Sequence, residues 1–133
     1  MNYVADTHAL VWFLFAQNRL STRVKDIFQR TEAGQHTVYV PAVAVAEMIM
    51  VVEKGRVQGT VPELLAGLAL MESAGHYQFL SLSPNLVIAS HLFTFIPDIF
   101  DRLIVADTHR LGYPLITRDD KIRKSGLVQT VWD

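Results

Sequence analysis

Apolar and polar residues follow two different periods along the chain, and these periods separate strands from helices. Short runs rich in Val, Ile, Leu and Tyr predict strands at residues 2–5, 36–40, 77–82, 115–117 and 128–131. Longer stretches with helical spacing, flanked by Ser, Thr, Asp, Pro or Gly, predict helices at residues 7–16, 21–33, 41–54, 62–74, 84–93 and 99–111. This alternation predicts an α/β fold with a mainly parallel sheet and helices on both faces.

Length and composition narrow the class of protein. A chain of 133 residues, half of them hydrophobic, suits one domain spanning residues 1–133 with its own core, and excludes a disordered tail protein. The absence of cysteine excludes disulfides and any Cys-based zinc site. No segment has the pattern of a signal peptide or a membrane span, so we expect a cytoplasmic protein with no membrane association.

The net charge is only −1, but the charged residues are unevenly distributed along the chain. The total argues against nucleic-acid binding by bulk charge. Six of the twelve cations nevertheless lie in the last third of the chain: Arg102, Arg110, Arg118, Lys121, Arg123 and Lys124. They form either a basic rim that attracts a phosphate backbone or an ordinary solvated face, and the sequence leaves both interpretations open.

Two acids lie just after predicted strands. Asp6 comes after residues 2–5, and Asp119 comes after residues 115–117 with one residue between. Ligands of parallel sheets gather at the carboxyl ends of the strands, so these carboxylates converge if their strands are neighbours. Asp6 is also placed to cap the following helix, and the two roles are compatible. We expect Asp120 to face solvent or to cap the next turn.

Two further acids stand in apolar surroundings. Glu47 is the one polar residue in the stretch 42–52, whose pattern predicts a buried helix. A buried carboxylate is costly unless it is paired, coordinated or protonated, so Glu47 is either a metal ligand or base in a cleft or the partner of a core arginine. Asp101 opens a helix beside an apolar stretch, and a local ion pair with Arg102 is the alternative. Asp98 is expected to be the helix cap.

Four acids from separate segments would repel one another if they were gathered without a counter-charge. Carboxylate oxygens without thiols select a hard divalent cation such as Mg²⁺ or Mn²⁺. Such an ion can orient a water molecule and stabilise the leaving oxygen of a phosphodiester. The five histidines lack metal-ligand spacing, and we expect structural or surface roles for them.

The ordered set of motifs is similar to the PIN-domain family, and within it to the VapC-type toxins of bacterial toxin–antitoxin pairs. The set comprises Asp-Thr-His-Ala-Leu-Val-Trp from residue 6, a Glu in a small-apolar helix, Pro-Asp-Ile-Phe-Asp-Arg-Leu-Ile-Val-Ala from residue 97, Pro-Leu-Ile-Thr-Arg-Asp from residue 114, and a closing Val-Trp. The resemblance covers essentially the whole chain. Each motif is weak alone, but their order and spacing are fairly specific.

This resemblance implies a Mg²⁺- or Mn²⁺-dependent endoribonuclease with a three-layer α/β/α fold. It also implies an RNA substrate, a cognate antitoxin partner and a homodimer. The implied catalytic and metal-binding residues are Asp6, Glu47, Asp101 and Asp119, and the substrate-binding candidates are Thr117, Arg102 and Arg118. Ile99 replaces the usual Pro of the third motif, which leaves Asp98 as a rival of Asp101. Asp107 stands where similar sequences often have Gln.

Two other function classes compete with this hypothesis. The first is a non-catalytic domain that keeps the scaffold and binds RNA or protein, against which the complete acid set argues. The second is a phospho-acceptor receiver or an aspartate-nucleophile phosphatase. The phosphatase pattern requires an Asp where His8 stands, and the pair Asp119-Asp120 comes too late for a receiver. The sequence does not indicate which RNA is recognised.

Overall fold

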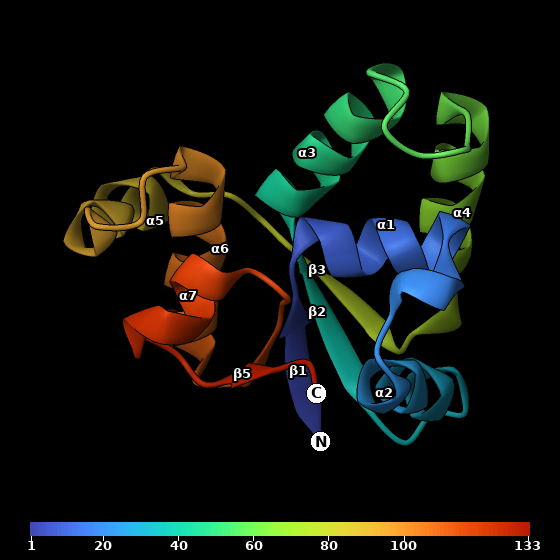
Figure 1. The fold of residues 1–133 in the computed structure, drawn as a ribbon, viewed down its shortest axis with the longest axis horizontal. Helices are drawn as coiled ribbons and strands as arrows, with labels where there is room; N and C mark the ends of the chain where they lie inside the picture. The colour runs from blue at the N-terminus through green and yellow to red at the C-terminus, as the bar shows by residue number, and fades with distance from the viewer.

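Five parallel strands form the centre of the protein, whose computed structural model describes residues 1–133 (Figure 1). The strand order is β3-β2-β1-β4-β5, and all four pairings are parallel. The strands are β1 (Asn2–Ala5), β2 (Thr37–Pro41), β3 (Tyr77–Leu80), β4 (Leu115–Ile116) and β5 (Thr130–Val131). The α/β class with a parallel sheet, predicted from the sequence, is therefore confirmed.

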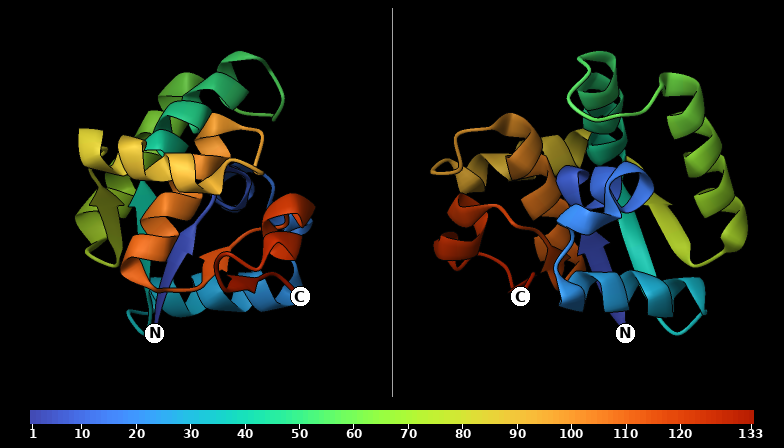
Figure 2. Two further views of the ribbon diagram at one scale, coloured as in Figure 1. Left: turned by 90° about the vertical axis from the view of Figure 1, so that its left-hand side faces the viewer. Right: turned by 45° about the vertical axis from the view of Figure 1, so that its right-hand side comes forward.

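Helices cover both faces of this sheet and complete three layers. The α-helices are α1 (Thr7–Phe15), α2 (Thr22–Glu32), α3 (Ala42–Glu53), α4 (Val61–Ala74), α5 (Pro84–Ala89), α6 (Ile99–Leu111) and α7 (Asp120–Ser125), and the short 3-10 helices are η1 (Gln17–Arg19) and η2 (Ser90–Phe93). α1 and α2 lie on one face, whereas α5 and α6 lie on the other (Figures 1 and 2). None of these helices combines the length and the apolarity that a bilayer crossing requires.

Local capping explains why most helix ends were predictable. The Ser21 hydroxyl accepts the Val24 N–H at the start of α2, and Thr60 forms a reciprocal capping box with Glu63 at the start of α4. α6 ends at Gly112, whose φ of 74° lies in the left-handed region that glycine enters at little cost.

The structure differs from the predicted elements in several places. The helix predicted at 84–93 divides into α5 and the 3-10 helix η2, and the strand predicted at 77–82 ends at Leu80, its last partner on β2 being Pro41. The short helix α7 was not predicted, because six residues are too few for an apolar period. Its signals are local: Asp119 caps it, and Gly126 ends it with φ 69°.

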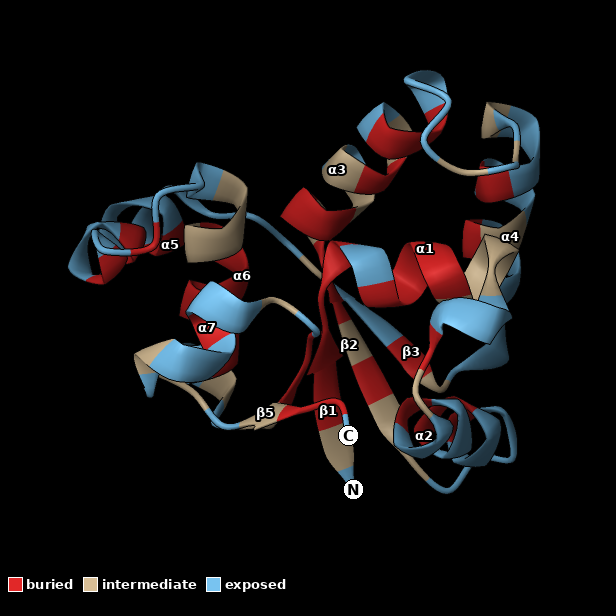
Figure 3. Ribbon diagram, viewed as in Figure 1, coloured by how far each residue is buried: buried red, intermediate tan, exposed pale blue.

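The prediction that the helix around Glu47 is buried on all sides is wrong. Val43, Met48 and Val51 are buried, but Ala46 and Met50 are exposed. α3 begins at the carboxyl edge of the sheet and extends beyond it (Figures 1 and 3), and one side of the helix stays uncovered. An apolar sequence pattern indicates which residues can be buried, but it does not predict which faces of the helix will pack against other elements.

The hydrophobic core surrounds β1. It is one cluster of 34 buried residues, in which Val4 and Ala5 on β1 have no exposed surface. β1 is the central strand, and its neighbours β2 and β4 complete its hydrogen bonding on both sides. The residue after β1 is therefore anchored to the buried centre of the sheet, which matters because that residue is Asp6.

Candidate active site

Asp6 leaves β1 and caps α1. Its Oδ1 accepts the Ala9 N–H at 2.9 Å, and its own N–H donates to the Ile116 carbonyl on β4 at 3.1 Å. Only 7% of the residue is exposed. The predicted helix-capping role is confirmed, and it fixes the carboxylate at the carboxyl edge of the sheet.

The parallel pairing of β1 with β4 brings the end of β4 to Asp6. Ala5 is in register with Ile116, so Asp6 and Thr117 follow neighbouring strands. The Thr117 hydroxyl accepts the Asp119 N–H at 3.1 Å, and Asp119 accepts the Ile122 N–H at 2.9 Å as the cap of α7. The structure thus places Asp119 beside Asp6 as the sequence predicted, and it shows that Asp119, not Asp120, caps the next helix.

Asp98 and Asp101 have separate roles at the start of α6. The Oδ1 atom of Asp98 accepts the N–H groups of Phe100 and Asp101 at 2.8 and 3.2 Å, so Asp98 is the cap. The Asp101 carboxylate forms no hydrogen bond or ion pair with the protein. The ion pair with Arg102 is absent, because that guanidinium donates to the carbonyls of Ile96 and Thr94.

Glu47 projects from the first half of α3 and is partly exposed. Its Oε1 accepts a hydrogen bond from the Thr7 hydroxyl at the start of α1. No arginine or lysine pairs with it, so the salt bridge to a core arginine is not formed. The contact with Thr7 ties Glu47 to the helix that Asp6 caps.

The pKa values show that these acids interact. Burial raises the pKa of Asp6 to about 6, against the opposing effects of Thr117, the Ala9 N–H and His8. Burial also raises the pKa of Asp101 to about 7, and the negative charges of Asp98, Asp119, Glu47 and Asp6 raise it further. The structure therefore brings all four predicted acids within electrostatic reach of one another.

Electrostatic reach is not direct coordination. No three of the Asp, Glu and His side chains lie close enough in this structure to share one ion. The donor chemistry nevertheless suits a hard divalent cation, because all four groups are carboxylates whose charges repel. A cation that retains water molecules can contact some of them through those waters.

Comparison with known proteins identifies the family of this chain. A family model described as the PIN domain matches residues 3–126. The chain belongs to the PIN-domain family. No curated protein matches the sequence significantly.

Solved structures share the fold of this PIN domain at low sequence identity. VapBC2 from Rickettsia felis, bound to a DNA fragment from its promoter, matches with a TM-score of 0.71 and 14% identity over 100% of both chains. A toxin–antitoxin complex from Klebsiella pneumoniae matches with a TM-score of 0.62 and 18% identity, covering 95% of this chain and 94% of that one. FitAcB from Neisseria gonorrhoeae matches with a TM-score of 0.61 and 17% identity, covering 96% of this chain and 95% of that one.

The cations of the PIN domain do not form a uniform basic rim. Arg110 pairs with the buried Asp107 at 3.2 Å, and Arg123 pairs with Asp133 at 3.3 Å. The guanidinium of Arg102 donates to two backbone carbonyls. A contact of Arg102 with substrate is not tested by this structure and stays a prediction. Arg118 differs, because it lines a cavity of about 270 Å³ together with Asp6, His8, Trp12 and Asp119.

Sequence reasoning missed three residues of this site. Thr7 binds Glu47, His8 lines the cavity, and Trp12 forms its wall. The signal for Thr7 and His8 was their position directly after Asp6, where a helix start holds them near the same sheet edge. Trp12 lies one helical turn after His8, and the two rings are 5.7 Å apart.

Proposed function

We propose that this PIN domain is a Mg²⁺- or Mn²⁺-dependent endoribonuclease, the toxin of a toxin–antitoxin pair, and that it acts in the cytoplasm. The observation that carries the proposal is the gathering of Asp6, Glu47, Asp101 and Asp119 at one edge of the sheet. Burial raises the pKa of Asp101 to about 7, and the negative charges of Asp98 and of the other three acids raise it further. Such a site gains stability from a divalent cation. The metal-dependent hydrolysis of phosphodiesters uses this donor chemistry.

Asp6 and Asp101 would hold the principal ion. Glu47 and Asp119 would complete the site directly, through water or by holding a second ion. When bound, the cation supplies a polarised phosphate oxygen and a bound water of lowered pKa. We therefore assign the hydrolytic water and the scissile phosphate to the cavity that Asp6 and Asp119 line.

The remaining residues of the chain orient these acids. The Ala9 N–H and Thr117 hold the Asp6 carboxylate, and the Thr7 hydroxyl holds Glu47. These contacts fix the acids before substrate arrives, which lowers the cost of assembling the reacting groups. Arg118 is exposed and lines the same cavity as Asp6 and Asp119, so it is placed to bind an RNA phosphate.

Replacement of Asp6 by Asn tests the assignment. The Asn side chain keeps an oxygen that can accept the Ala9 N–H, so the fold and the cap of α1 are retained. We expect the loss of Mg²⁺-dependent cleavage of a mixed RNA substrate, by at least about 100-fold, because one charged ligand is gone. Cleavage is measured with Mg²⁺, with Mn²⁺ and with EDTA, and thermal unfolding verifies the fold.

Asp26→Asn is the matched control, because Asp26 is an exposed acid of α2 that pairs only with Arg30. This variant should cleave RNA as the wild type does. Cleavage that persists in Asp6→Asn, or that EDTA leaves unchanged, would contradict the proposal. A wild type that binds RNA without cleaving it would support the alternative, a catalytically inactive PIN scaffold that binds RNA or protein.

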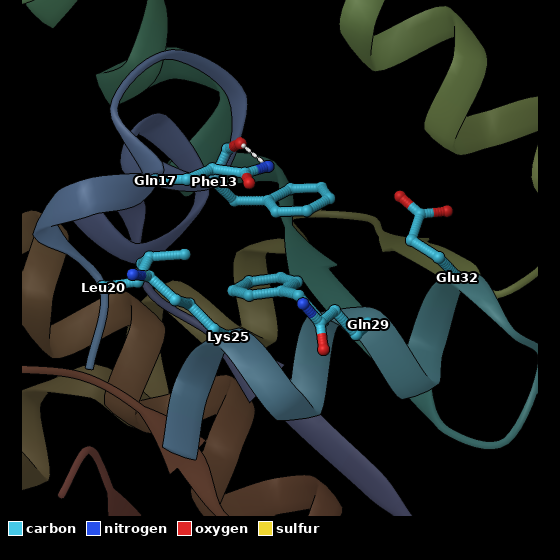
Figure 4. Close-up of a pocket in the computed structure, with 7 residues that line it drawn as sticks. Phe13, Gln17, Leu20, Lys25, Gln29 and Glu32 are labelled. Atoms are coloured by element: carbon cyan, nitrogen blue, oxygen red, sulfur yellow. Dashed lines mark hydrogen bonds between the residues drawn. The ribbon is translucent and has the colours of Figure 1, made fainter. Parts of the chain in front are cut away.

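An antitoxin partner is part of the proposal, and an apolar groove beside α1 supports it. The ring of Phe13 stacks on Phe28 at 4.3 Å in a hollow of about 330 Å³, with polar side chains at its edge (Figure 4). A second hollow of about 550 Å³ shares Phe13 and extends to Met71 and Tyr77. An apolar floor with a polar edge suits the amphipathic segment of a partner protein.

A homodimer is also part of the proposal. Large apolar side chains are exposed along the segment from the loop before α5 to the start of α6: Leu82, Val87, Ile88, Leu92, Phe95 and Ile99. Such a concentration of exposed apolar side chains is typical of a protein–protein interface. A second copy of the chain is the partner that we propose for this segment.

A further inference from the structure

Two arginines from distant parts of the chain meet at one aromatic ring. The Cζ atom of Arg19, at the end of η1, lies 4.6 Å from the centroid of the Trp12 ring. The Cζ atom of Arg118, in the loop after β4, lies 5.8 Å from the same centroid. Trp12 is only 8% exposed and contacts Trp132 edge-on at 5.8 Å, so the ring is a fixed support.

Neither guanidinium is neutralised by the protein. Arg19 and Arg118 are both exposed, and neither forms an ion pair or a side-chain hydrogen bond. Two positive charges near one ring repel each other, and an anion between them would relieve that repulsion. The cation–π contacts favour both side chains beside the ring in the absence of such an anion.

A polar cavity of about 640 Å³ opens at these arginines. It lies between η1, α7 and the segment after β5, and its lining includes Asn18, Arg19, Arg118, Asp120 and Arg123. Arg118 also lines the smaller cavity that holds Asp6 and Asp119, so the two hollows adjoin at this residue.

The charge of the larger cavity favours an anion. Of its two acids, Asp133 is paired with Arg123 at 3.3 Å, and only Asp120 has no partner. The cavity is therefore lined by two unpaired arginines, Arg19 and Arg118, and by one unpaired acid, which favours a negatively charged ligand. The wall is also held in place, because Ser21 donates to the Trp132 carbonyl and Arg23 donates to the Asp133 carbonyl at 2.9 Å.

We propose that Arg19 and Arg118, supported by Trp12, bind an RNA phosphate next to the scissile one, so that the strand leaves the acidic centre through this cavity. A guanidinium matches phosphate oxygens in a planar, bidentate geometry. Trp12 is a positioning residue in this arrangement: it reduces the freedom that each arginine loses on binding. The inference rests on the proposed ribonuclease function, and it adds Arg19 and Trp12 to the substrate site.

The test measures the binding of a fluorescent single-stranded RNA in EDTA, over a series of salt concentrations, and cleavage with Mg²⁺. Arg19→Ala should raise the Kd about tenfold and lower the slope of log K against log salt by about 0.7, the value for one phosphate contact on a single strand. In cleavage, its effect should fall on KM. Arg56→Ala, which removes an exposed cation of the α3–α4 connection, is the matched control and should change neither quantity.

Trp12→Phe tests the positioning role without opening a large cavity. It should raise KM in the wild-type background, because Phe supports a cation less well than Trp. It should add little in an Arg19→Ala/Arg118→Ala background, where no guanidinium is left to position. An equal loss in both backgrounds would assign Trp12 a structural role and overturn that part of the inference.

The outcomes separate the inference from the proposed function. If the wild type cleaves RNA and Arg19→Ala behaves like Arg56→Ala, the inference alone is overturned. If the wild type binds RNA but never cleaves it, the ribonuclease proposal fails, and the comparison of Arg19→Ala with Arg56→Ala still decides the phosphate site. A wild type that does not bind RNA overturns both. A polyglutamate peptide that displaces the probe as well as unlabelled RNA does would assign the cavity to an acidic protein segment and overturn the RNA assignment.

Discussion

At the start of α1 one carboxylate both caps the helix and belongs to the acidic site, whereas at the start of α6 these two roles belong to two different carboxylates. Asp6 caps α1 and also lines the acidic cavity. In α6, Asp98 accepts the N–H groups of the first turn, and Asp101 has no hydrogen-bond partner in the protein. At α1, the carboxylate of the site is therefore held by the cap hydrogen bond. At α6, a separate residue is the cap, and the carboxylate of the site is not held by the protein.

The difference has an electrostatic consequence. Hydrogen bonds from the Ala9 N–H and Thr117 stabilise the charged form of Asp6, and its pKa rises only to about 6 although the residue is buried. The pKa of Asp101 rises to about 7, because burial and the charges of four neighbouring acids disfavour its charged form and no group donates a hydrogen bond to it. The carboxylate whose charge is least satisfied by the protein gains most from a bound cation.

Replacing Asp101 gives the largest expected effect. Asp101→Asn should lower kcat for RNA cleavage by about 100-fold or more, since the substitution removes the least satisfied metal-binding charge. It should leave the metal-free fold at least as stable as the wild type, because a neutral side chain ends the repulsion. Single-turnover cleavage with Mg²⁺ and urea unfolding in EDTA measure the two effects.

The matched control for this experiment is Asp98→Asn. Asn is as good a helix cap as Asp, so this variant should keep both the fold and cleavage within a few-fold of the wild type. The opposite result, with cleavage lost in Asp98→Asn and retained in Asp101→Asn, would reverse the assignment. Asp98, the first acid of the motif, would then be the ligand.

A second prediction concerns stability against pH in EDTA. The folded-state pKa values of Asp6 and Asp101 are raised from 3.8 to about 6 and about 7, so the native protein binds more protons than the unfolded chain between about pH 4 and 7. The free energy of unfolding that these groups contribute therefore falls as pH rises through this window. For the buried Asp6 the loss is on the order of 2–3 kcal/mol, and partial exposure reduces the loss at Asp101 relative to its shift.

Urea unfolding at pH 4 and pH 8 measures most of this loss. Asp101→Asn should show a smaller decrease between the two pH values than the wild type, and Mg²⁺ at pH 8 should restore the stability of the wild type. The pKa of His36 is lowered by burial and by the N-terminal charge, which acts in the opposite direction, so the difference between variants is the informative quantity. Identical pH profiles of wild type and Asp101→Asn would contradict the electrostatic comparison.

The sequence predicted those parts of the site that follow from local rules. Asp6 and Asp119 could be placed because residues after neighbouring parallel strands meet at one edge, and the register of Ala5 with Ile116 confirms it. Asp98 could be predicted as a cap from its position before α6. These features depend on a few consecutive residues and on the direction of the strands.

The parts that were missed depend on which surfaces the fold brings together. The pattern around Glu47 gave no sign that one side of α3 stays open, or that Thr7 would be its partner. The meeting of Arg19 with Arg118 at Trp12 joins η1 to the loop after β4, and no period marks such a contact. Contacts between distant segments follow from packing, which a local pattern does not encode.

The smallest expected effect belongs to Asp98, and it tests whether the division of tasks at α6 is complete. Asp98→Ala removes the acceptor of two N–H groups and should destabilise the protein by about 1 kcal/mol, while Asp98→Ser, which can still cap, should restore most of it. The loss of the Asp98 charge also lowers the pKa of Asp101, so any pH dependence of cleavage should move to lower pH. If Asp98→Ser is as unstable as Asp98→Ala, capping is not what Asp98 contributes. If Asp98→Ala loses cleavage as fully as Asp101→Asn does, the two acids act together, and the start of α6 is no less constrained than the start of α1.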